Sequence, residues 1–104
     1  MMDARSWLGD RLAAAPTDLS ETMSAALAAV DVGQSVPDTL ASAALTLYRS
    51  VLIGSGGRED ALPLLAADAL FTHAFEAQAE TEPSRLVEFA RRWGAGGRLA
   101  GVAE

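Results

Sequence analysis

Apolar side chains recur every three or four residues along most of this chain, which is the period of an amphipathic helix. The pattern is clearest over residues 17–30, where one stripe holds Leu19, Met23, Ala26, Leu27 and Val30. Thr17 precedes this stripe and belongs to a residue type that caps helices, so we expect it to cap this one. A shorter stripe over residues 3–14 predicts a first helix, packed as an N-terminal arm within residues 1–15.

A second capping pattern predicts a third helix. Ser35-Val36-Pro37-Asp38 has the form of a capping box, and its proline stands in the first turn, where no amide proton is needed. The apolar stripe of this helix runs from Leu40 to Val51. Residues 51–53 taken alone also fit a strand, but the helical period favours the end of a helix.

The most hydrophobic segment follows Asp60, which we expect to open a fourth helix. Pro63 is tolerated there because it falls in the first turn. The apolar residues cover more than one face of this helix: Leu64, Leu65, Ala67, Leu70, Phe71, Ala74 and Phe75. An apolar surface this wide predicts that the helix lies at the centre of the core.

The rest of the chain completes an all-α pattern. A fifth helix is expected from about residue 83 to residue 93, followed by glycines and a weakly ordered tail over residues 94–104. The 104 residues are half hydrophobic, with many alanines and few aromatics, which suits one domain of closely packed helices, residues 1–104. The predicted fold is a small all-α bundle of about five helices around one central apolar helix.

Charge and composition argue against several classes of function. The net charge is −6, and all eight basic residues are arginines without a dense patch, so we expect no nucleic-acid partner. There is no cysteine, which removes thiolate zinc sites and disulfides. No stretch approaches the roughly 18 uncharged apolar residues of a membrane span, and the first residues do not resemble a secretory signal. We expect a cytoplasmic protein with no membrane span and no bound cofactor or metal.

Residues 51–59 invite a phosphate-binding interpretation, because apolar residues, glycines and a helix start follow one another there. The segment resembles the opening strand and turn of glycinamide ribonucleotide synthetase. However, Glu59 occupies the place of the third glycine of the dinucleotide fingerprint, where its charge would repel a pyrophosphate. We therefore interpret this segment as a loop between two helices.

Two residues of the fourth helix carry the remaining candidate chemistry. His73 is the only histidine, and a metal site would need further ligands on its face. Glu76 and Glu80 share a flank with it, so we expect His73 to be hydrogen-bonded or paired with a carboxylate. Asp68 stands among apolar residues and would be costly to bury alone. We expect it to bind Thr72 one turn on, or Arg49 on the adjacent helix.

A family resemblance appears over the same helix. Residues 64–76, which read LLAADALFTHAFE, resemble the L-A-G-D-A-L-L-T-x-A-F-E helix of the trans-polyprenyl diphosphate synthases. Residues 86–101 resemble the helix that follows it and its glycine-rich end, at about the family's usual distance.

The departures from the family define what the resemblance implies. Catalytic members carry two D-D-x-x-D runs that hold magnesium against the diphosphate, and this chain has neither. Ala67 replaces the glycine of the G-D pair, no lysine is present, and only Asp68 matches. No catalytic residue is therefore carried over.

The resemblance implies a shortened, non-catalytic relative, similar to the small helical subunits of two-component synthases. The alternatives are a helical interaction module unrelated to prenyl chemistry and, less favoured, a free-standing enzyme. In the two non-catalytic cases we expect a protein partner or a homodimer. The expected interface or polar core is the set Asp68, Phe71, Thr72, His73 and Phe75.

Overall fold

The computed structural model describes residues 3–30, 34–54, 56–94 and 97–102, and every regular element in these ranges is helical. In chain order the elements are α1 (Ala4–Ala13), α2 (Thr17–Ala28), α3 (Val36–Leu52), the 3-10 turn η1 (Arg58–Asp60), α4 (Ala61–Thr81), the 3-10 turn η2 (Pro83–Arg85), α5 (Leu86–Trp93) and α6 (Arg98–Val102). The all-α class and the five expected helices are confirmed. The strand alternative for residues 51–53 is wrong, because α3 continues to Leu52 and ends on a helical Ile53.

Local capping explains where two of the helices begin. The Ser35 side chain accepts a hydrogen bond from the Asp38 amide at 3.3 Å, as the capping pattern predicts, and the Asp3 side chain accepts one from Ser6 at 2.8 Å at the start of α1. Thr17 does not cap α2. It is the first helical residue, and extended Pro16 occupies the cap position without a side-chain hydrogen bond.

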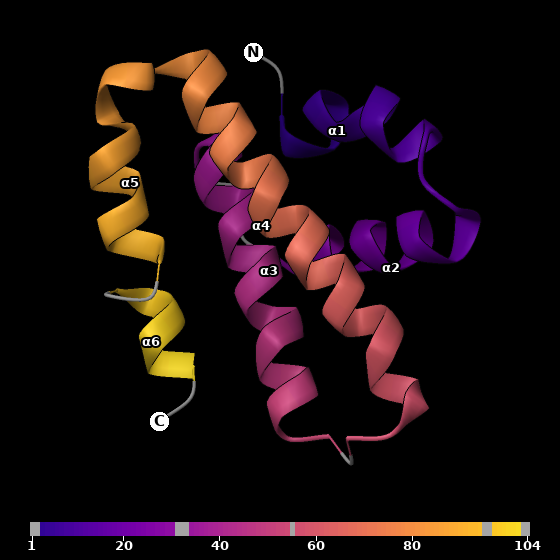
Figure 1. Cartoon of the computed structure of the whole chain (residues 1–104). Helices are drawn as coiled ribbons and strands as arrows, with labels where there is room; N and C mark the ends of the chain where they lie inside the picture. Colours follow the sequence, from indigo (N-terminus) through magenta and orange to yellow (C-terminus); the bar gives the residue numbers. More distant parts are fainter. Residues whose placement is uncertain (1–2, 31–33, 55, 95–96, 103–104) are drawn as a thin grey trace.

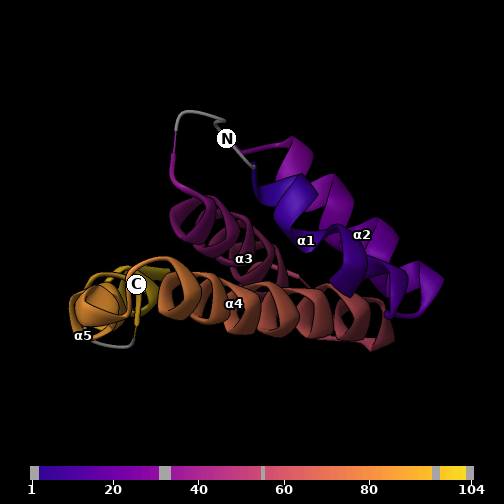
Figure 2. The same ribbon diagram turned by 90° about the horizontal axis from the view of Figure 1, so that it is seen from above.

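Helices α3 and α4 form an antiparallel hairpin through the middle of the molecule (Figure 1). Helices α1 and α2 lie together on one side of this hairpin, and α5 and α6 lie on the other (Figure 2). Alanines line the contact between the two central helices, and Ala41, Ala44, Ala66, Ala74 and Ala77 are fully buried. Their small side chains allow the two backbones to approach closely. As expected, α4 is central, and it shares this place with α3.

The two ends of the hairpin differ in burial. At the hairpin base, residues 36–45 and 70–81, helices pack on both sides. At the hairpin tip, residues 49–54 and 56–65, the pair extends beyond its neighbours (Figure 1). Leu64 and Leu65 were expected in the core, but they are 42% and 55% exposed. Phe71 and Phe75 are only partly buried, packed against the core.

The segment expected to be a weakly ordered tail contains α6. Leu99 of this helix is partly buried against the core, and the Arg98 guanidinium lies 4.9 Å from the centroid of the Trp93 ring. These contacts place α6 on the α5 side of the hairpin.

Candidate functional site

The helical period divides the five residues expected at an interface or polar core between different sides of α4. Asp68, Phe71 and Phe75 follow one stripe, because they are spaced three and four residues apart. His73 lies on the other flank, toward α1, and Thr72 is exposed. The structure therefore brings three of them together and separates the other two.

Asp68 avoids the cost of burial because it is exposed and hydrogen-bonded. Its carboxylate accepts a hydrogen bond from the Tyr48 hydroxyl of α3 at 2.5 Å. The prediction that Asp68 binds Thr72 or Arg49 is wrong. The helical phase of α3 directs Tyr48, and not the next residue Arg49, toward α4. Burial, and then the hydrogen bond to Asp68, raise the pKa of Tyr48 well above its usual range. A tyrosine held protonated in this way ties α3 to α4 and does not serve as a base at neutral pH.

An aromatic chain runs from this hydrogen bond to α5. Tyr48 meets Phe71 edge to face with 6.2 Å between ring centroids, Phe71 meets Phe75 at 5.3 Å, and Phe75 meets Phe89 at 5.1 Å. Phe89 and Trp93 continue it at 6.4 Å, and both are buried. Edge-to-face geometry is a favoured packing of aromatic rings. The expected site residues Phe71 and Phe75 therefore join three helices.

His73 belongs to a polar clasp between α1 and α4. Its Nδ1 atom lies 2.7 Å from Glu76, one of the two carboxylates expected on its flank, and its ring meets Trp7 edge to face. Glu80 accepts hydrogen bonds from the Trp7 indole at 2.9 Å and from Arg11 at 3.0 Å, while the Arg11 guanidinium stacks 3.7 Å from the Trp7 ring centroid. These contacts hold α1 against the bundle. Among the described residues, no three His, Cys, Asp or Glu side chains form a group able to hold a metal ion.

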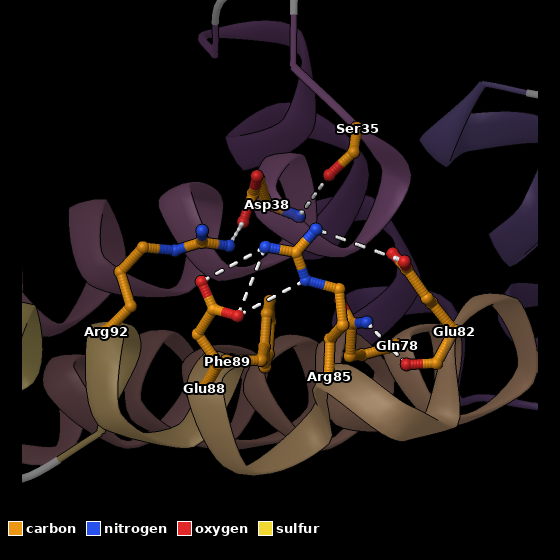
Figure 3. A pocket seen from close by; sticks show the side chains of 8 residues that line it. All are labelled: Ser35, Asp38, Gln78, Glu82, Arg85, Glu88, Phe89 and Arg92. Atoms are coloured by element: carbon orange, nitrogen blue, oxygen red, sulfur yellow. Dashed lines mark hydrogen bonds and ion pairs between the residues drawn. The ribbon is translucent and has the colours of Figure 1, made fainter.

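A polar cleft of about 190 Å³ lies between the start of α3 and α5 (Figure 3). Arg85 binds Glu88 through contacts of 3.1–3.2 Å and lies 4.0 Å from Glu82. Arg92 binds Asp38 at 2.6 Å. Both arginines are thus matched by carboxylates, and the cleft offers no uncompensated cation for an anionic ligand.

Asp38 has a wider role in this cleft than its place in the capping box indicated. Besides Arg92, its Oδ1 atom accepts a hydrogen bond from the Trp93 indole at 2.8 Å. The capping box predicted only a local role for this carboxylate. Its partners are 54 and 55 residues away, and no local pattern signals a contact at that separation.

An apolar groove of about 840 Å³ lies between α1, the end of α2 and the start of α3. Its volume is within the range of small-molecule sites, which combine apolar walls with a few convergent polar groups. Of its charged residues, Asp3 caps α1, and both Asp3 and Arg5 are exposed. Every buried side-chain nitrogen and oxygen among the described residues already has a partner, so no unsatisfied buried polar group marks a ligand here.

The hairpin tip is the largest departure from ordinary packing. Its exposed apolar side chains come from both helices: Leu52, Ile53, Leu62, Leu64 and Leu65, which are 36% to 87% exposed. Isolated exposed leucines are common, but a cluster of exposed apolar residues is typical of an interaction surface.

The Asp60 carboxylate occupies the glycine loop of the hairpin tip. Asp60 accepts a hydrogen bond from the Gly56 amide at 2.7 Å, and Gly56 has a positive φ of 79°, which glycine adopts without strain. The Asp60 carboxylate also faces Gly54, where an added Cβ would lie 2.6 Å from it. The loop follows a helix rather than a strand and already binds an anionic group, so its geometry argues against a phosphate site.

No protein-family model, curated protein or solved structure matches this chain. None of the described helices has the length and hydropathy needed to cross a membrane.

Proposed function

We propose that this chain is a non-catalytic helical protein that acts by binding another protein chain through the hairpin tip. The observation that carries the proposal is the exposure of Leu52, Ile53, Leu62, Leu64 and Leu65 at the one end of the hairpin that no other described helix covers. Fully burying a side chain of this size contributes about 1.5–3 kcal/mol. A partner that covers the tip would recover a share of this free energy from each residue.

The chemistry of the described residues supports binding over catalysis. The polar cleft and the α1–α4 clasp consist of side chains that bind one another, and the pairs Arg11–Glu80 and Arg92–Asp38 join different helices. Tyr48 and Asp68 bind each other. These side chains are already used in holding the bundle together.

The resemblance to polyprenyl diphosphate synthases suggests a class of partner. The resembling segment, residues 64–76, begins with two of the exposed leucines of the tip, Leu64 and Leu65. The more specific form of the proposal is therefore a partner subunit of a full-length synthase. The alternative form is an interaction module unrelated to prenyl chemistry.

Affinity isolation from the native host, followed by rebinding of the purified partner, tests the proposal. We compare wild type with Leu65→Glu at the tip and with Val87→Glu on α5, because these residues are 55% and 65% exposed and neither change disturbs the core. Wild type and Val87→Glu should bind the partner, and Leu65→Glu should lose at least about tenfold in affinity, or about 1.4 kcal/mol. Equal binding by all three chains would contradict the proposal.

Co-expression with the host's polyprenyl diphosphate synthase separates the two forms. A tip-dependent change in the rate or product length of the synthase supports the partner-subunit form. An unchanged synthase together with tip-dependent binding of a different protein supports the interaction module.

A further inference from the structure

The charges of the hairpin tip are balanced, unlike those of the rest of the chain. The tip contains Arg49, Arg58, Glu59 and Asp60, two charges of each sign, so the whole net charge of −6 lies elsewhere. Arg49 and Arg58 are exposed, and neither forms an ion pair with a described residue. The tip therefore combines an apolar cluster with unpaired cations and neighbouring carboxylates.

A surface of this kind suits contact with itself. In a two-fold dimer the same patch meets itself, so it must be self-complementary. Leucines of one copy would then meet leucines of the other, and Arg49 or Arg58 would approach the Asp60 carboxylate of the other copy, which accepts a hydrogen bond from Gly56 within its own chain. A strongly basic partner would instead be attracted to the acidic body of the molecule.

We propose that the hairpin tip binds a second copy of this chain, tip to tip about a two-fold axis. This inference rests on the proposed function and adds a second copy of the chain as a partner of the tip. The tip projects from the bundle (Figure 1), so contact there keeps the two acidic bodies apart, whereas a side-by-side dimer would bring like charges together. Only a few side chains of each copy would take part, so we expect a weak dimer that dissociates on dilution.

Sedimentation equilibrium of the purified protein, from micromolar to millimolar concentration, is the first test. Wild type and Val87→Glu should dimerise with the same dissociation constant. Leu65→Glu should dimerise at least about tenfold more weakly, because each copy would place a carboxylate in the apolar contact. Circular dichroism verifies that all three chains keep the same helical content.

The absence of cysteine allows a second test of orientation. Ile53→Cys places the only thiol of the chain on the most exposed apolar residue of the tip, and Val87→Cys places it on α5 as the control. A short bismaleimide should link Ile53→Cys into a covalent dimer at concentrations where Val87→Cys stays uncoupled. Equal coupling of both variants would overturn a tip-to-tip contact.

The outcomes also separate this inference from the proposed function. The wild type could stay monomeric at all concentrations and still bind another host protein that Leu65→Glu fails to bind. This result would overturn the dimer and leave the proposed function standing. A monomeric wild type with no tip-dependent partner overturns both. Undiminished dimerisation of Leu65→Glu would show that the two copies meet elsewhere.

Discussion

Both ends of the α3–α4 hairpin carry leucines, but the two ends differ in how far these leucines are buried. At the hairpin base, Leu40 and Leu70 are fully buried because α1, α2 and α5 pack around the central pair. At the hairpin tip, Leu52 and Leu65 are more than half exposed because the flanking helices end before reaching them. An apolar helix face thus becomes core or surface according to the reach of its neighbours. The comparison supports the assignment of the tip as a binding surface.

The largest expected difference between the two ends concerns leucine truncation. Leu40→Ala at the base should lower the free energy of unfolding by about 2–5 kcal/mol, because it removes buried methyl groups and leaves a cavity. Leu65→Ala at the tip should lower it by less than about 1 kcal/mol, since this residue is already largely hydrated. Urea unfolding at low protein concentration measures both. Similar losses at the two positions would remove the distinction between base and tip.

The next largest loss of stability is expected when a polar contact of the hairpin base is removed. Asp38→Ala should lower the free energy of unfolding by about 1–3 kcal/mol, because the Trp93 indole and Arg92 would both lose their acceptor. Glu88→Ala is the control, since its pairing with Arg85 is exposed and such pairs contribute at most about 1 kcal/mol. If Glu88→Ala were the more damaging change, the cleft would be held by its surface pairs instead.

The pH dependence tests Tyr48, which lies between base and tip. Its pKa is raised in the folded state by burial and then by Asp68, so this contribution to stability is complete below the unfolded pKa of about 10 and is lost as the pH rises through the folded value. The chain has one tyrosine, no lysine and no cysteine, so its side-chain titration in this range belongs to Tyr48. The free energy of unfolding of the wild type should therefore fall as the pH rises above about 10. The fall should be smaller for Tyr48→Phe, which has no hydroxyl to ionise. Unfolding curves at several alkaline pH values measure the difference, and identical curves for the two chains would contradict it.

The smallest effect is expected from making the tip polar. Leu62→Gln combined with Leu65→Gln should change the free energy of unfolding by less than about 0.5 kcal/mol, because both residues are exposed and far from the packed base. The same variant should lose tip-dependent association. A clear drop in monomer stability would show that the tip leucines support the fold, and binding would then be a secondary role.

Local interactions account for what could be predicted from the sequence about the site. The pairing of His73 with Glu76 spans three residues of one helix, so helical spacing alone suggests it. The apolar residues of α4 were identified correctly, but which of them are buried depends on the helices that cover them. Leu64 and Leu65 were therefore assigned to the core in error.

By itself, the sequence determined the all-α class, the positions of the five main helices and the Ser35 cap, because helical period and capping act between residues a few positions apart. Only the tertiary structure decided that Asp68 binds Tyr48 rather than Arg49, and that Asp38 reaches α5. The tertiary structure also decided that no other described helix covers the hairpin tip. These features depend on the phase and reach of helices that are distant in the chain, and such relations leave no periodic pattern to read.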